Sequence, residues 1–187
     1  PVGYTGLTES WNGSSWTEVN DLNTPRSSLG STDGSATAAL AIAGYRGPPT
    51  ADRTKFVEQW NGSSWTNGTS VNTTRIRGGA SGIQTSLLFF GGTTGSNSAA
   101  TELWNGTNWS NVNNMNTAGD GKAAAGTSTA AISIGGSGGD GNDTELWNGT
   151  NWVSQSTLNV GRSAGGGGGT ASSAIYAGSN PGPQVAS

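Results

Sequence analysis

The sequence predicts an all-β fold, a β-propeller of four-stranded blades, and three observations support this prediction. A pair of tryptophans recurs four times along the chain. An Asn-Gly step follows the first tryptophan of every pair, and each repeat also contains one short apolar run bounded by small residues. Self-similarity at a period of about 40–50 residues is the signature of propellers and related repeat proteins.

The tryptophan pairs define the repeat. Each pair reads W-N-G-x-x-W, and successive pairs are separated by 49, 44 and 43 residues. A glutamate stands two positions before the first tryptophan in every copy. The tryptophans are Trp11 and Trp16, Trp60 and Trp65, Trp104 and Trp109, and Trp147 and Trp152; the glutamates are Glu9, Glu58, Glu102 and Glu145.

The local sequence of each repeat predicts strands. Glycine is frequent throughout, which disfavours helices, and the apolar runs are four to six residues long between Gly, Asn and Ser. Asn-Gly between two tryptophans is a strong hairpin signal, because both residues tolerate positive φ. The apolar runs lie at 39–44, 87–92, 131–136 and 174–178. Each unit therefore holds four short strands, the size of one propeller blade.

These motifs resemble the kelch repeat. The shared features are a small doublet after a hydrophobic strand, then Glu-x-aromatic, then a second aromatic, then a segment ending in Arg before a Gly-rich strand. The sequence departs from the kelch pattern in three ways. Trp stands where the first aromatic is usually Tyr, and the second aromatic follows at a shorter spacing. The Gly doublet is Ala-Gly at 43–44 and 177–178. The W-N-G-x-x-W repeats also resemble those of structural proteins of marine bacteriophages.

We expect one propeller domain over 1–187, with four blades closed by pairing of the N- and C-terminal strands. The third and fourth strands of blade 4 are predicted at 1–22, and its first and second strands at about 158–187. Blades 1, 2 and 3 are predicted at about 23–70, 71–114 and 115–157. Closure removes open sheet edges. A piece of a longer array, or a ring shared between chains, is the alternative.

The resemblance implies a binding site at the mouth of the central channel. Arg26, Arg75 and Arg162 precede the inner strand of their blades, and Ser27 and Ser163 follow two of them. This ring could hold an acidic peptide or anionic sugar, but the third copy has Gly119-Asp120 instead. The longest insertion is the second candidate contact region, with Tyr45, Arg46, Asp52 and Arg53.

The repeated tryptophans and glutamates have structural interpretations. Four equivalent occurrences favour packing between blades over sugar-stacking platforms, and favour a structural hydrogen bond over paired catalytic acids. Asn12, Asn61, Asn105 and Asn148 fit the glycosylation sequon, but the hairpin turns explain them. A weak calcium candidate consists of Asp140, Asn142 and Asp143.

Composition narrows the function classes. The chain has no Cys and no His, a net charge of -3 and no basic run. We therefore expect no thiolate metal site, no cofactor, no nucleic-acid partner and no membrane insertion. Copper oxidases of kelch type need His and a Cys-Tyr pair, which excludes that chemistry here.

The expected function is non-enzymatic. We predict a structural or adhesive module on a virion or cell surface, such as a phage tail appendage or capsid decoration. Its expected partners are other virion or surface proteins, within an oligomer or larger assembly. The alternative is a lectin-like propeller that binds a host surface glycan.

Overall fold

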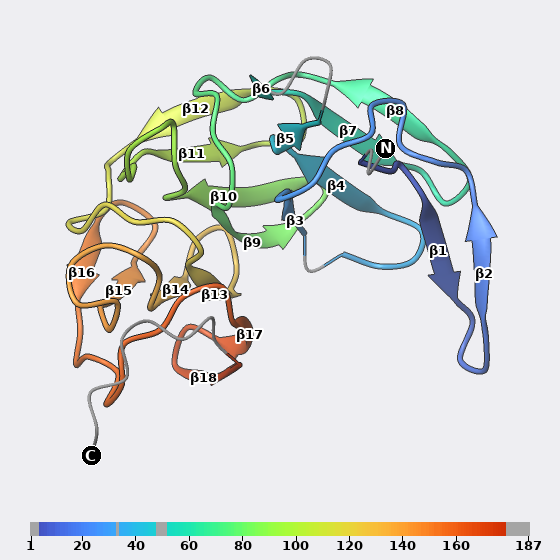
Figure 1. Cartoon of the computed structure of the whole chain (residues 1–187). Coiled ribbons are helices and arrows are strands. Elements are labelled where there is room, and N and C mark those ends of the chain that lie inside the picture. The colour runs from blue at the N-terminus through green and yellow to red at the C-terminus, as the bar shows by residue number, and fades with distance from the viewer. Residues whose placement is uncertain (1–3, 33, 48–51, 179–187) are drawn as a thin grey trace.

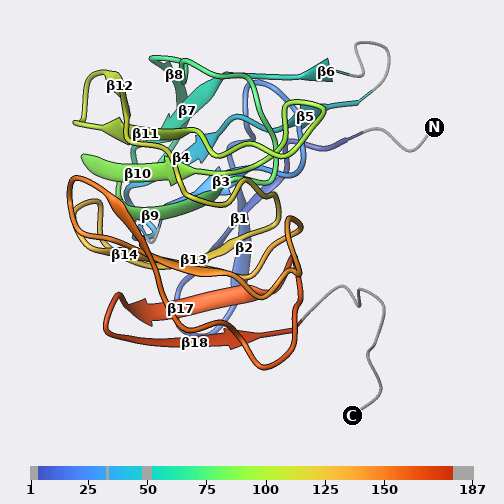
Figure 2. The same cartoon turned by 90° about the vertical axis from the view of Figure 1, so that its left-hand side faces the viewer.

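The computed structural model describes residues 4–32, 34–47 and 52–178, and these residues form an all-β arc (Figure 1). Three four-stranded antiparallel sheets follow one another along the arc, and a two-stranded hairpin stands at each end. Figure 2 shows the hairpin β17–β18 beyond β13 and β14 at one end of this stack. The architecture is propeller-like, with each sheet as one blade.

The strands of each sheet follow chain order, so every blade is a meander. Blade 1 consists of β3 (Gly30–Ser31), β4 (Ala39–Ile42), β7 (Val57–Trp60) and β8 (Trp65–Gly68). Blade 2 consists of β9 (Gly79–Ile83), β10 (Ser86–Phe90), β11 (Thr101–Trp104) and β12 (Trp109–Val112). Blade 3 consists of β13 (Ala123–Gly126), β14 (Ala131–Ile134), β15 (Thr144–Trp147) and β16 (Trp152–Ser154).

The two terminal hairpins are called half-blades here, because each has two strands where a blade has four. The N-terminal half-blade pairs β1 (Thr8–Trp11) with β2 (Trp16–Val19), and the C-terminal half-blade pairs β17 (Gly166–Thr170) with β18 (Ser173–Ala177). Among the described residues, β1 pairs only with β2 and β18 only with β17. The predicted pairing of the terminal strands is therefore not formed in the structure, and the half-blades lie at opposite ends of the arc (Figure 1).

The W-N-G-x-x-W motifs form the hairpin turns that the sequence predicts. In each turn the side-chain oxygen of the asparagine accepts hydrogen bonds from the backbone amides of the residues two and three positions further along, at 2.8–2.9 Å. The glycine after each asparagine has φ between 92° and 98°. The two tryptophans are directly paired across the hairpin, with ring centroids 5.1–5.6 Å apart.

The apolar core lies between blades. One cluster joins Leu40 and Ile42 of blade 1 to Leu87, Phe89 and the two tryptophans of blade 2. A second cluster joins Leu88 and Phe90 of blade 2 to the two tryptophans of blade 3. Consecutive residues of β10 thus face opposite sides of the sheet, one toward blade 1 and the next toward blade 3, as the side-chain period of two in a strand requires. The tryptophan pairs of blades 2 and 3 pack against the preceding blade, whereas Trp11 and Trp16 are 47% and 65% exposed.

A chain of backbone hydrogen bonds links the loops before the innermost strands. The amide of Arg77 donates to Ser28, that of Gly121 donates to Arg77, and that of Ala164 donates to Gly121, at 2.8–3.0 Å. All four residues have φ between 56° and 62°. Left-handed backbone is costly for non-glycine residues, so the repeated conformation indicates that blade-to-blade bonding holds these loops in place.

Candidate functional site

The repeated glutamate is the centre of a buried polar cluster in each complete blade. The Glu58 carboxylate accepts hydrogen bonds from the backbone amides of Asn23 and Thr24, at 2.7 and 3.2 Å. It also forms an ion pair with Arg26. Both side chains are fully buried, and Arg26 further donates to the backbone oxygens of Ala43 and Ala41. The cluster ties the loop before the inner strand to the third strand of the blade.

Blade 2 repeats this arrangement. Glu102 accepts from the amides of Asn72 and Thr73, and its carboxylate lies 2.7 Å from the guanidinium of Arg75. Arg75 stacks over the Phe89 ring at 4.3 Å. Burial lowers the pKa of Arg75 from its ordinary value, while the charge of Glu102 opposes that change.

Blade 3 fills the vacant arginine position with a lysine three residues further along. Glu145 accepts from the amides of Asn116 and Thr117, at 2.8 and 2.9 Å. Lys122 is buried, and its ammonium donates to the Gly135 carbonyl at 2.9 Å. Burial lowers the pKa of Lys122, against the raising effect of Asp143 and Glu145. The missing arginine is visible in the sequence as Gly119-Asp120, but the replacement by Lys122 is not.

The fourth copy of the cluster is divided between the two ends of the arc. Glu9 is exposed, and its carboxylate has no hydrogen-bond or ion-pair partner among the residues that the structure describes. Arg162 lies over the Tyr176 ring at 5.0 Å, and its buried Nε is unpartnered. Ser163 beside it is partly buried. The structure therefore does not bring the three predicted arginines into one open ring, since Arg26 and Arg75 are buried inside their blades.

The predicted contact insertion forms a small ladder of its own. Tyr45–Arg46 (β5) pairs with Asp52–Arg53 (β6), and residues 48–51 between them lie outside the described residues. The guanidinium of Arg46 binds the Asp52 carboxylate through two contacts at 2.5 and 2.9 Å. This pairing raises the pKa of Arg46. Ser27 exchanges backbone hydrogen bonds with Tyr45 and so anchors the ladder to blade 1.

The residues of the calcium candidate lie in a loop, and the backbone carbonyls of two of them accept hydrogen bonds. The carbonyl of Asn142 accepts from Leu158 at 2.9 Å, and that of Asp143 accepts from Gly135 at 2.8 Å. Asp140 lies in the same turn, against Gly161. Within the described residues, no group of three or more acidic side chains is arranged to hold a metal ion.

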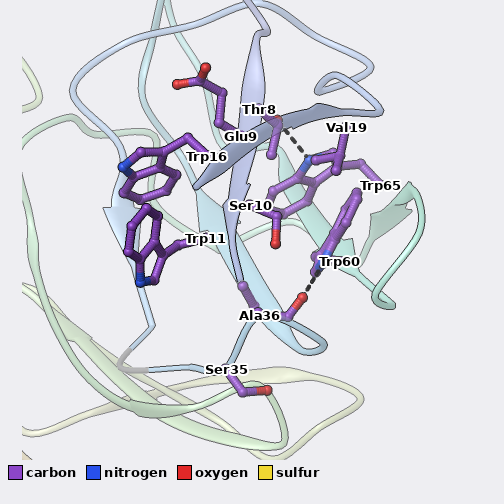
Figure 3. Close-up of a pocket in the computed structure, with 11 residues that line it drawn as sticks. Thr8, Glu9, Ser10, Trp11, Trp16, Val19, Ser35, Ala36, Trp60 and Trp65 are labelled. Atoms are coloured by element: carbon purple, nitrogen blue, oxygen red, sulfur yellow. Dashed lines mark hydrogen bonds between the residues drawn. The ribbon is translucent and has the colours of Figure 1, made fainter. Parts of the chain in front are cut away.

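A tryptophan-lined cavity of about 460 Å³ lies beside the N-terminal half-blade (Figure 3). Trp60 and Trp65 border it on the blade 1 side, and Trp11 and Trp16 belong to the half-blade (Figure 3). Trp11 and Trp16 are 47% and 65% exposed, whereas Trp104 and Trp147 of complete blades are at most 2% exposed. The sequence could not identify this cavity, because the tryptophans of all four copies look equivalent.

A second cavity, of about 310 Å³, lies at the other end of the arc. Its walls come from blade 3 and the C-terminal half-blade, and include Ile132, Ile134, Thr144, Arg162 and Tyr176. Each cavity thus occurs where a half-blade leaves the neighbouring complete blade partly uncovered. The described part of the chain contains no apolar helix of membrane-spanning length.

Comparison with known proteins supports the fold alone. No protein family and no curated protein matches the sequence. Among solved structures, the chain is similar to the one described as "Structure of YjhT", with a TM-score of 0.77 and 12% sequence identity. The match covers 96% of this chain and 74% of that one. It supports a propeller-like, all-β architecture.

Proposed function

We propose that this chain is a non-enzymatic structural or adhesive module on a virion or cell surface, and that it acts through protein–protein contacts. One observation carries the proposal: the repeated charged residues are used inside complete blades, whereas the terminal half-blades expose large apolar side chains. Trp11, Trp16 and Ile175 are 47%, 65% and 70% exposed. Trp11 and Trp16 lie side by side, with ring centroids 5.6 Å apart, and an exposed apolar patch of this kind marks an interaction site.

The proposal includes a fourth blade of kelch-like type. The hairpins β17–β18 and β1–β2 correspond to the inner and outer halves of each complete blade, in the chain order that the sequence predicts. Low charge, absence of cysteine, and the likeness of the repeats to those of phage structural proteins favour a phage tail appendage or capsid decoration. Repetition of one rigid unit suits such a scaffold.

Immunogold labelling tests the location. Antibodies against the chain are applied to sections of the source cells and to particles released from them. Label on particle or cell surfaces supports the proposal, and label confined to the cytosol overturns it. Pre-absorption of the antibody with the purified chain provides the control for specific labelling.

Glycan binding is the second candidate, because aromatic side chains line the first cavity beside Thr8, Glu9 and Ser10. Aromatic faces with nearby polar groups suit sugars. Tryptophan fluorescence titrated with a glycan panel tests it. Saturable binding that is lost in Trp65→Ala but kept in Trp147→Phe, remote from the cavity, supports a lectin. No response across the panel argues against it.

A further inference from the structure

We propose that the two ends of the arc are complementary halves of one interface, in which the β17–β18 hairpin of one copy pairs with the β1–β2 hairpin of a second copy. The inference rests on the proposed protein–protein function and names the partner. It follows from three separate correspondences: strand edges, apolar surfaces and charges.

The strand edges correspond in register. In blades 1, 2 and 3 the second strand pairs with the third in one register. The first paired residue of the second strand lies opposite the first tryptophan of the repeat: Ala39 opposite Trp60, Leu87 opposite Trp104, and Ala131 opposite Trp147. The same alignment pairs Ala174 of β18 with Trp11, and Ala177 with Thr8, of the second copy. Both edges are unpaired in the described structure, and unpaired edges readily accept another strand.

The first cavity fits Ile175. In blade 2 the equivalent residue is Leu88, which is fully buried against Trp147 and Trp152 of the next blade. Ile175 occupies this position on β18 and is 70% exposed. In the second copy, the equivalent tryptophans are Trp60 and Trp65, which border the first cavity. Docking would therefore bury Ile175 in the tryptophan-lined space of Figure 3.

The second cavity fits the exposed tryptophans of the second copy. Trp152 packs edge to face with Phe90 of the preceding blade at a centroid distance of 4.8 Å, and its indole donates to Thr101 at 3.0 Å. The equivalent positions in blade 3 are Ile134 and Thr144, both in the wall of the second cavity. Trp16 of the second copy would pack there, so each cavity receives the apolar residues that the other end exposes.

The charges correspond as well. In blades 1 and 2 the glutamate of the third strand binds the arginine that precedes the first strand. The only arginine and glutamate at the matching positions of the two half-blades are Arg162 and Glu9. Neither forms an ion pair with the described residues of its own chain. A second copy would bring Glu9 to Arg162 and to the backbone amides at Asn159 and Val160.

A second copy fits the arc better than closure within one chain. Three complete blades, joined by two continuous apolar clusters, hold the two half-blades apart (Figures 1 and 2). Pairing β18 with β1 of the same chain would require these packed blades to rotate against one another. A head-to-tail contact between copies satisfies both edges without such a change. The contact is heterologous, so a free edge remains at each end of a dimer.

The experiment separates the two faces with one exposed substitution on each. Glu9→Lys disables the β1 face, and Ile175→Asp disables the β18 face. Asp21→Lys and Ile83→Asp are matched controls, because Asp21 is exposed outside the strands and Ile83 is 55% exposed on another blade. Mass is measured by sedimentation and light scattering across protein concentration, after circular dichroism has shown that each variant is folded.

We expect concentration-dependent assembly of the unsubstituted chain and of both controls. Each interface variant alone should need a protein concentration at least about tenfold higher to associate. A mixture of Glu9→Lys and Ile175→Asp keeps one intact copy of each face, so it should give a 1:1 heterodimer that grows no further. Hydrogen exchange in that heterodimer should show new protection confined to β1 of one chain and β18 of the other.

Three results would overturn the inference. They are a monomer at every concentration, assembly that neither interface variant affects, and protection of β1 and β18 already present in the monomer, which would show closure within one chain. None of these results bears on surface labelling, so the proposed function stands or falls separately. Glycan binding to a strictly monomeric chain would favour the lectin alternative instead.

Discussion

The guanidinium of Arg75 lies 2.7 Å from the carboxylate of Glu102 in the interior of blade 2, and neither side chain is more than 1% exposed. The same pair forms in blade 1 and is separated between the two ends of the arc in the fourth copy. This relationship connects the repeat in the sequence to the stability of a blade, and it leads to the first prediction.

Glu102→Ala leaves the Arg75 charge buried without its partner, together with two backbone amides that lose their acceptor. Removal of one member of a buried pair costs about 3–5 kcal/mol. We expect a loss of this size in denaturant unfolding followed by tryptophan fluorescence. Glu18→Ala, at an exposed position, should change stability by less than about 0.5 kcal/mol. Equal losses in both variants would contradict a structural role for the buried cluster.

Lys122 should make the stability depend on alkaline pH. Burial lowers its folded-state pKa, so the unfolded chain binds more protons between that lowered pKa and the ordinary value of 10.5. Stability therefore rises with pH in this window, as the cost of burying the charge is relieved. The unfolding free energy of the unsubstituted chain, minus that of Lys122→Met, should increase from pH 7 towards 10.5. Lys55→Met, at an exposed position, is the control for loss of a lysine elsewhere; a flat difference for Lys122→Met would refute the prediction.

Trp147 and Trp11 are equivalent in sequence but not in burial, at 2% and 47% exposed. Trp147→Ala should cost about 3–5 kcal/mol, the usual range for a buried aromatic. Trp11→Ala should cost far less when measured at low protein concentration, where the half-blade is uncovered. Thermal and denaturant unfolding compare the two. A similar cost for both would indicate that the half-blade is covered in the isolated chain.

A Gly62→Ala substitution tests the backbone conformation of the hairpin turn separately from side-chain packing. The φ of Gly62 is 94°, and an added Cβ would meet no atom closer than 3.6 Å. Gly62→Ala should therefore cost about 1–2 kcal/mol through backbone strain alone. Asn67→Ala, at an exposed position on β8 of the same hairpin, is the control. Denaturation midpoints of the two variants give the comparison, and a neutral Gly62→Ala would mean that the turn tolerates another conformation.

The blades could be predicted because their determinants are local. The Asn-Gly turn, the flanking tryptophans and the alternating apolar strand all lie within one repeat, so a single sequence contains each of them four times. The role of Glu58 as an acceptor for the loop at Asn23 can be anticipated from its repetition, whereas the sequence predicts that its partner Arg26 contacts a ligand. Only the geometry shows that the arginine points into its own blade.

The remaining features depend on contacts that repetition hides. Lys122 reaches its position from three residues beyond the vacant arginine site, which a strict alignment does not reveal. The two cavities arise because Trp11 and Arg162 belong to the same repeat element but lie at opposite ends of the arc. A sequence periodic from end to end cannot show where packing stops, so the candidate site could not be located from the sequence.

The chain of amides through Ser28, Arg77, Gly121 and Ala164 passes from one blade to the next. Proteins built this way behave as nearest-neighbour systems, in which each unit is stabilised mainly by the units beside it. Among the residues that the structure describes, each terminal hairpin has one neighbouring blade, so the hairpins should fray before the middle blade unfolds. Coupling the ends of successive copies would give every blade two neighbours and make unfolding of the assembly more cooperative than that of its single chain.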